Sequence, residues 1–442
     1  MKIVISCAYF SAFFGLGFCL AIIGPSMLEL SEITGEGLGA MGTVFTWRAV
    51  GYLCGTLVGG QAFEKYPGEP LLTGSSLLAG VGTLFIPHCR SLVSLGLAVA
   101  SQGVAMGFLD TGGNVLLLRL HADPTNPSAA DPFMNTMHFF FALGAFFIPL
   151  IMDLFDSMGA NFSASYTLTG CYMFSVAIAL CFLSWYVWKT DFYVEKQKAI
   201  AVETVGGVFN ADKLTSASSE AATPSAASQT KGKRRFSEKL LFFSTGALLF
   251  VYVGAESTYG GLLYTYVVTN VGFSNSQGKA VTSIYWGMLA IGRAVAVPLS
   301  MKFTPVQLLM LDMVGCSVAS LILLMFPQNP LVYWIMSGVY GLSMASVFPT
   351  AINAAAYFTT VDGPAASAIV VGASLGDMSI PLGTAVLFVV WGGWSFPAIM
   401  FSLAIASFFA FLVMVFLGRR VQQERQQNTS AAERNGLEMA SV

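Results

Sequence analysis

The most restrictive feature of this sequence is a series of twelve apolar stretches, each long enough to cross a lipid bilayer as a helix. About 20 residues of helix span the hydrocarbon core of a membrane. A helix also satisfies its own backbone hydrogen bonds there without a partner strand. The sequence therefore predicts an all-α membrane protein with twelve transmembrane helices, at roughly residues 3–24, 37–62, 70–87, 92–118, 133–152, 165–188, 239–268, 278–301, 306–326, 331–356, 364–391 and 395–417.

Composition excludes several other classes of protein. Only 10% of the residues are charged, the net charge is −2 and the mean hydropathy is +0.70, whereas soluble domains carry about 25% charged residues. A soluble enzyme and a nucleic-acid-binding surface are both excluded. The seven cysteines show no metal-ligand spacing, and no nucleotide-binding loop or catalytic triad is present. We expect no cofactor, no metal centre and no enzymatic activity.

The distribution of Lys and Arg predicts the orientation in the membrane. With the N-terminus in the cytoplasm, 17 of these residues lie on the inside and only Arg90 and Lys279 lie in outside loops. Short cytoplasmic loops carry such an excess of positive charge. Both termini are therefore predicted to be cytoplasmic, and the lipid bilayer is the predicted environment of the chain.

A polar segment divides the predicted spans into two groups of six. Residues 189–238 are rich in Ser, Ala and Lys, and such a composition cannot bury a core. We predict an N-terminal half at 1–188, a disordered cytoplasmic linker at 189–238, a C-terminal half at 239–417 and a polar cytoplasmic tail at 418–442.

The two halves resemble each other. Residues 143–150 and 375–382 match at five of eight positions, including the Pro of each span. Gly55 aligns with Gly292, and Asn114 aligns with Asn353, at similar offsets. These matches in register indicate that the chain arose by duplication of a six-helix unit.

Six plus six spans with parallel repeats and a central linker resemble the major facilitator architecture. Residues 59–67 are similar to the glycine–acidic–basic loop of that superfamily, without its second basic cluster. Residues 107–118, 132–146 and 252–261 resemble the fourth, fifth and seventh spans of a narrower group. That group comprises sodium-dependent glucose transporter 1 and the major facilitator superfamily domain-containing 4 proteins.

The resemblance implies a secondary or facilitative transporter of a small polar solute, with a hexose such as glucose as the best guess. Transport would proceed by alternating access around a cavity at the midplane, with Na⁺, H⁺ or no ion as the coupling partner, and the plasma membrane is the expected location. The rival reading is a non-transporting scaffold or receptor on the same fold. A membrane-embedded enzyme ranks third, because no paired nucleophile and base is present.

Candidate site residues in the N-terminal half centre on Asp110, near the middle of its span. A charge there costs about 2.5–3.5 kcal/mol on insertion scales and needs a reason. Gln102, Asp110 and Asn114 recur at four-residue spacing and are predicted to share one helix face. Asp110 could bind sugar hydroxyls, Na⁺ or a proton, or it could cap its own helix. His138 is either a further ligand or a core residue.

In the C-terminal half the corresponding carboxylate is Glu256, which could bind substrate or Na⁺, or pair with Arg293. Tyr259 is predicted to face the same cavity, because it follows Glu256 by three residues. Asn353 is a candidate sugar ligand, and Asp377 is a second coupling candidate.

Four further residues complete the predictions. Arg48 lies inside the second span and is predicted to neutralise Asp110 or Glu256, or to bind substrate. Glu64, Lys65 and Arg293 are predicted to gate the cytoplasmic side. Asn161 begins the sequence Asn-Phe-Ser in a loop predicted to lie outside, which makes it a glycosylation candidate.

Overall fold

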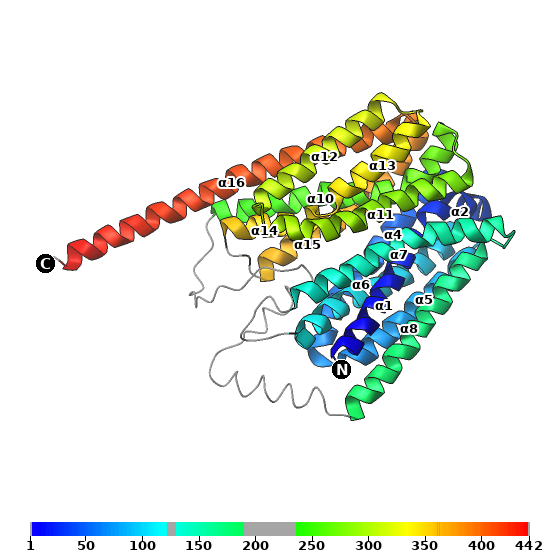
Figure 1. Ribbon diagram of the computed structural model, residues 1–442, viewed down its shortest axis with the longest axis horizontal. Helices are drawn as coiled ribbons and strands as arrows, with labels where there is room; N and C mark the ends of the chain where they lie inside the picture. The colour runs from blue at the N-terminus through cyan, green and yellow to red at the C-terminus, as the bar shows by residue number, and fades with distance from the viewer. Residues whose placement is uncertain (1, 122–129, 190–235, 360, 362, 441–442) are drawn as a thin grey trace.

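The computed structural model describes residues 2–121, 130–189, 236–359, 361 and 363–440, and nearly all of these are helical. Two bundles lie side by side (Figure 1). The first contains α1 (Lys2–Ala21), α4 (Thr43–Lys65), α5 (Gly68–Phe85), α6 (Leu92–His121), α7 (Asp131–Ser157) and α8 (Ser163–Lys189), with the short helices α2 (Met27–Thr34) and α3 (Leu38–Met41). The second contains α10 (Phe236–Tyr266), α11 (Asn275–Ser300), α12 (Pro305–Met325), α13 (Pro330–Met344), α14 (Val347–Phe358), α15 (Gly363–Trp391) and α16 (Ser395–Ala440).

Eleven helical segments of the described chain are long and apolar enough to cross a membrane. Helix α4 is the twelfth long segment and occupies the place of the predicted second span, although Arg48, Glu64 and Lys65 lower its hydropathy. The predicted tenth span consists of two helices, α13 and α14, which meet at a break. Residues 190–235 of the predicted linker lie outside the described residues. The predicted polar tail continues α16 as a helix as far as Ala440.

The predicted duplication is visible in the packing. In the first bundle α1 packs on α7 and α4 packs on α6. In the second bundle α10 packs on α15 and α11 packs on α13. Counted as spans, these are the pairs 1–5 and 2–4, followed by 7–11 and 8–10. The same pairing rule therefore holds in both halves.

Glycines allow the paired helices to approach through their backbones. A Cβ atom added at Gly51 or Gly55 of α4 would collide with backbone oxygens of α6, and one at Gly103 or Gly107 of α6 would collide with backbone oxygens of α4. Small residues drive such close packing in membranes, where lipid tails are as apolar as Leu. The contact carries Tyr52 of α4 to the level of Asp110 on α6.

This packing makes a prediction for two glycines. We expect Gly107→Ala to lower the midpoint of thermal unfolding in detergent, because overpacking costs about 1–3 kcal/mol. Gly60→Ala on α4 is the matched control, since a Cβ there meets nothing within 4 Å. The control should be neutral or slightly stabilising, because Ala is the better helix former. Equal midpoints for the two variants would contradict the backbone contact.

Among the described residues, the shared core of the two bundles lies toward one end. In Figure 1 the C-terminus and the start of α10 lie at the left, and the N-terminus and the end of α8 lie at the lower end of the first bundle; we call this end of the two bundles the terminus end and the opposite end the far end. Buried apolar residues near the far end of the first bundle, such as Phe45 and Ile148, belong to one core with the second bundle. Those near the terminus end, such as Ile5 and Leu120, form a separate core. The bundles are therefore closed at the far end.

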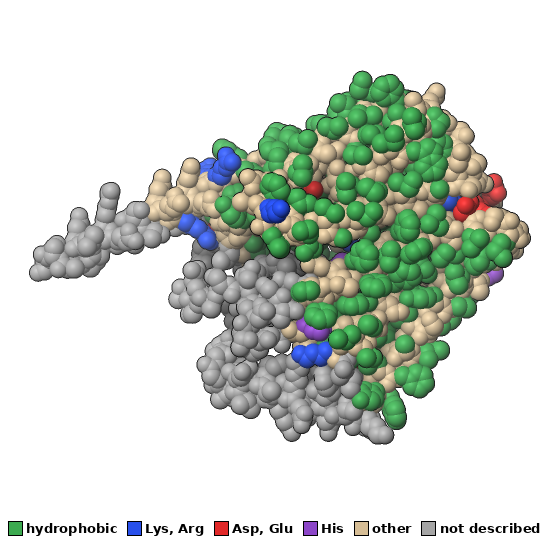
Figure 2. All heavy atoms as spheres, in the orientation of Figure 1, with side chains coloured by type: hydrophobic (Ala, Val, Ile, Leu, Met, Phe, Trp, Pro, Cys, Tyr) green, Lys and Arg blue, Asp and Glu red, His purple; other side chains and the backbone are tan. Residues whose placement is uncertain are grey.

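The kinds of side chain on the surface also differ between the terminus end and the far end. Hydrophobic side chains dominate the visible face between the two ends, whereas Lys and Arg gather toward the terminus end and acidic side chains at the far end (Figure 2). Exposed Leu, Val and Phe side chains on the long helices are what a lipid-facing surface requires. The protein is a multi-pass membrane protein.

Candidate functional site

A cluster of polar side chains lies at mid-span in the first bundle. The hydroxyl of Tyr52 donates to Asp110 Oδ2 at 2.5 Å, and the amide of Asn114 donates to Asp110 Oδ1 at 3.2 Å. His138 Nε2 lies 3.2 Å from Asn114 Oδ1. Three helices, α4, α6 and α7, thus supply one hydrogen-bonded group, which we call the Asp110 cluster. It unites three of the predicted residues.

The second bundle holds a charged pair at the corresponding depth. Arg293 Nη2 of α11 lies 4.0 Å from Glu256 Oε1 of α10, and their side chains are 22% and 15% exposed. The guanidinium of Arg293 also lies 5.9 Å from the centre of the Phe141 ring on α7, in the other bundle. The ion-pair alternative predicted for Glu256 matches this geometry, and Arg293 faces the interface between the bundles.

A third group joins the two bundles. Arg48 Nη2 of α4 lies 3.8 Å from Asp377 Oδ1 of α15, and Arg48 Nη1 donates to the carbonyl of Leu20 at 3.2 Å. The Arg48 side chain is only 5% exposed and stacks over the Phe45 ring. The structure pairs Arg48 with Asp377, instead of with Asp110 or Glu256 as the sequence predicted.

The backbone of α15 is interrupted next to Asp377. Pro381 lies four residues after Asp377 and has no N–H, so it removes one helical hydrogen bond at that turn. Next to it, the hydroxyl of Thr46 on α4 donates to the Met378 carbonyl at 2.9 Å. The interrupted turn of α15 therefore docks on α4 at the level of Arg48.

Two predicted ligands lie away from these groups in this conformation. Gln102 is fully buried and donates to the Thr83 hydroxyl of α5 at 2.7 Å. The structure does not bring Gln102 beside Asp110, because steps of four residues rotate by about 40° each and eight residues turn a side chain well away. Tyr259 is also fully buried; its hydroxyl bonds Ser337, and its ring packs on Tyr285 and Tyr340.

The remaining predicted residues are accounted for individually. Asn353 is half-buried on α14. Glu64 and Lys65 are exposed at the terminus end of α4, and neither forms an ion pair within the described chain. Asn161 is exposed in the loop between α7 and α8, where its side chain accepts from the Ser163 amide. Their roles in binding, gating and glycosylation stay predictions.

Sequence reasoning missed a second set of contacts between the bundles, at the far end. Lys279 of α11 pairs with Asp156 of α7, and Ser276 of α11 donates to Asp153 of α7 at 2.9 Å. The Lys279 side chain is only 1% exposed. We call these four residues the far-end seal. The available signal was that Lys279 is one of only two cations in the predicted outside loops.

The central groups offer oxygen ligands and guanidinium groups for binding a substrate or an ion. No three His, Cys, Asp or Glu side chains gather as a metal site in the described chain. The Asp110 cluster instead offers a carboxylate, a phenol, a carboxamide and an imidazole. Such groups bind hydroxyls by hydrogen bonds, and a carboxylate with neighbouring oxygens also suits a hard cation.

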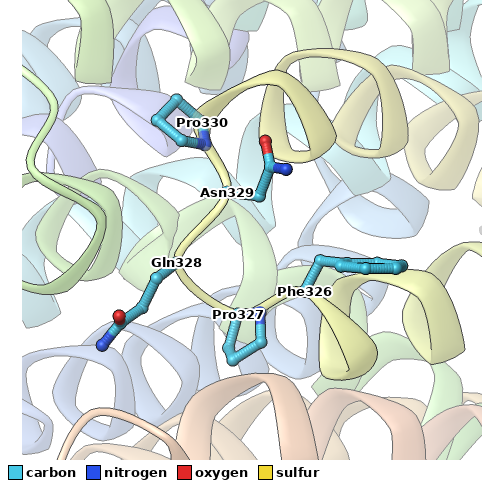
Figure 3. A pocket seen from close by; sticks show the side chains of 5 residues that line it. All are labelled: Phe326, Pro327, Gln328, Asn329 and Pro330. Carbon is cyan, nitrogen blue, oxygen red and sulfur yellow. The ribbon is translucent and has the colours of Figure 1, made fainter.

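An open hollow lies far from this centre, in the loop between α12 and α13 (Figure 3). Five consecutive residues line it, Phe326 to Pro330, and their side chains point in different directions. It contains no titratable side chain, and we assign it no role in the site.

Comparison with known proteins agrees with this architecture. The family described as Major Facilitator Superfamily matches residues 5–356. Sodium-dependent glucose transporter 1 of Xenopus laevis is 32% identical over 92% of this chain and 81% of its own length. Major facilitator superfamily domain-containing protein 4A of Danio rerio is 27% identical over 98% of this chain and 93% of its own length.

Among solved structures, the xylose transporter XylE from E. coli in a partially occluded inward open conformation superposes with a TM-score of 0.65. The match covers 93% of this chain and 97% of that one at 10% identity, which establishes the common fold. A protein of this superfamily is a membrane transporter and not an enzyme. The chain belongs to the Major Facilitator Superfamily and, within it, to the family of sodium-dependent glucose transporter 1.

Proposed function

We propose that this protein transports a hexose such as glucose across the plasma membrane, driven by a coupled cation, with Na⁺ favoured over H⁺. The observation that carries the proposal is the placement of charge. Asp110, Glu256 and Asp377 all lie on long helices, and the groups of Glu256 and Asp377 reach the interface of the bundles. Intramembrane carboxylates are costly and mark ion or substrate pathways.

The partners of each carboxylate suggest which group binds the cation and which binds the sugar. Asp110 accepts hydrogen bonds from Tyr52 of α4 and Asn114 of α6, and a carboxylate with neighbouring oxygens is a ligand set that suits a hard cation. Glu256 and Asp377 face Arg293 and Arg48. We assign cation binding to the Asp110 cluster and sugar binding to the interface beside Glu256 and Arg293, where Phe141 supplies an aromatic face.

Alternating access would use the contacts between the bundles. The far-end seal and the Arg48–Asp377 pair hold the present state together. Rocking of one bundle against the other would break the seal and close the terminus end. Glu64 and Lys65 at the terminus end are proposed to gate that closed state.

The orientation belongs to the same proposal. We place the terminus end in the cytoplasm, since Lys and Arg gather there, and this makes the present state inward-facing. Residues 189–238 would then be a cytoplasmic linker between the two halves, and Asn161 would lie outside, where it can carry a glycan. Protease protection of tags at both termini in sealed cells tests this orientation.

Substitution of the two central carboxylates tests the transport mechanism. We expect Asp110→Asn to abolish sodium-driven accumulation of labelled glucose in proteoliposomes, while exchange across an equilibrated membrane persists. The amide keeps the size of the side chain but removes the charge that a cation needs. Glu256→Gln should weaken accumulation and exchange together, because it alters the sugar site.

Three outcomes would contradict the proposal. Absence of glucose uptake by the wild type with any gradient would reject the substrate. Uptake that follows a proton gradient and ignores Na⁺ would replace the cation. Unchanged accumulation in both variants would remove Asp110 and Glu256 from the mechanism and leave His138 and Asp377 as the next residues to test.

A further inference from the structure

A carboxylate that the proposed transport mechanism does not use is buried within the second bundle. Asp312 of α12 is only 7% exposed and lies within a membrane-spanning helix. In the described part of the chain it forms no ion pair within 4 Å. A buried carboxylate in a membrane needs a compensating partner or a function.

The hydrogen-bond partner of Asp312 lies at the break in the tenth span. The helix ends at Met344, resumes at Val347, and leaves Ala345 and Ser346 between the two segments. The Ser346 hydroxyl donates to Asp312 Oδ2 at 2.5 Å. The corresponding span of the first bundle, α6, is continuous over 30 residues. The break is therefore a special feature of the second bundle.

Ser346 occupies the N-cap position of α14 but does not cap it. A serine at this position usually accepts a hydrogen bond from a backbone N–H of the first turn. Here the side chain makes no such bond and is turned toward Asp312. The carboxylate thus lies beside the positive end of the α14 dipole, which stabilises a negative charge.

The two segments of the tenth span are held separately. At the end of α13, the Met344 carbonyl accepts a hydrogen bond from Tyr252 of α10 at 2.7 Å. Helix α14 is held at its start by Asp312, and at its other end Thr359 donates to Glu238 of α10 at 3.2 Å. Helix α14, which carries Asn353, is therefore held at both ends by contacts separate from those of α13.

Tight packing around the break favours a proton over a metal ion. A Cβ at Gly315 of α12 would collide with Ser343, and one at Gly292 of α11 would collide with Ala345. These contacts restrict the space beside the break on the α11 and α12 sides. A Na⁺ ion needs several oxygen ligands around it, whereas a proton needs only the carboxylate.

Few titratable groups lie around Asp312 in the described part of the chain. Cys316 lies one turn further on α12 and is its titratable neighbour. Helix α13 contributes the phenol of Tyr340, which interacts with Cys316, and α14 contributes Ser346. Helices α11 and α16 place no described Lys or Arg within 4 Å of the carboxylate.

We propose that Asp312 is a proton-binding site that latches α14. The ionised carboxylate accepts the Ser346 hydrogen bond and faces the start of α14, which keeps the helix in place. A proton on Asp312 removes the charge, so both interactions weaken and α14 is released. The inference goes beyond the proposed function, because the latch is separate from the residues assigned to cation and sugar binding and requires no particular substrate.

Hydrogen–deuterium exchange of the α14 amides in the detergent-solubilised full chain tests the latch from about pH 5 to about pH 9, with α5 as the internal reference for the intrinsic rate. We expect the corrected exchange of wild-type α14 to rise about tenfold toward low pH, since hydrogen bonds to charged groups are the strong ones. Asp312→Asn should remove this dependence. Ser346→Ala should raise α14 exchange at high pH.

Cys316→Ser is the matched control and should keep the wild-type dependence, because it changes the adjacent titratable group alone. If Asp312→Asn does not fold, Ser346→Ala decides: wild-type protection at high pH in that variant overturns the latch. A pH dependence that persists in Asp312→Asn, or none in the wild type, also overturns it. The readout needs no sugar, so failure of the proposed transport would leave this result intact.

Discussion

Lys279→Glu is expected to open the far-end seal and shift the protein toward the opposite conformation by about 10- to 100-fold. An exposed pair contributes about 0.2–1 kcal/mol and a broken buried pair costs about 3–5 kcal/mol. The seal lies between these limits, because Lys279 is 1% exposed and Asp156 is 47% exposed. The new carboxylate would also face Asp156 itself.

Spin labels at Ser157 and Asn275, which end α7 and begin α11, measure this shift as a longer distance between the helices. The background would replace the four exposed cysteines, Cys7, Cys54, Cys171 and Cys181, by serine. The double variant Asp156→Lys/Lys279→Glu restores opposite charges and should return the short distance. A short distance in the single variant would show that the seal does not hold the bundles.

Arg48→Met should reduce transport by more than about 100-fold and lower the midpoint of thermal unfolding. Removing one partner of a buried ion pair costs about 3–5 kcal/mol, because the other charge stays buried without compensation. Here Asp377 would lose its ion-pair partner and the Leu20 carbonyl would lose its donor. The first effect falls on the interface between the bundles, and the second falls within the first bundle.

A second substitution separates the structural role of this pair from its functional role. Arg48→Met combined with Asp377→Leu removes both charges and should restore most of the unfolding midpoint, since apolar replacement of a whole pair is often neutral. Transport should remain lost if the pair is remade in each cycle. Recovery of both quantities would assign the pair to stability alone.

The sequence carried the membrane architecture almost completely. Apolar stretches of the right length identify the spans, because lipid admits little else. The matches between residues 143–150 and 375–382 predicted a duplication, and the same helix pairs in both bundles agree with it. The family could also be identified from the residues around Asp110, Asn135 and Glu256. Each of these features depends on residues that are close together in the sequence, so the order of residues alone reveals it.

Spacing along one helix predicted part of the site. Asp110 and Asn114 are four residues apart and do meet, as the helix repeat requires. Gln102 does not join them, because its side chain has rotated toward α5 over two further turns. Tyr259 likewise faces Ser337 in the core, although Glu256 three residues earlier faces Arg293.

Only the tertiary structure decided which charges meet. Arg48 and Asp377 are 329 residues apart in the sequence, and their contact depends on how α4 docks against α15. The partners of Lys279 and of Asp312 are set in the same way, by helices that adjoin in space and not along the chain. Sequence periodicity determines the face of a helix that a residue occupies, but the packing of helices determines what that face touches.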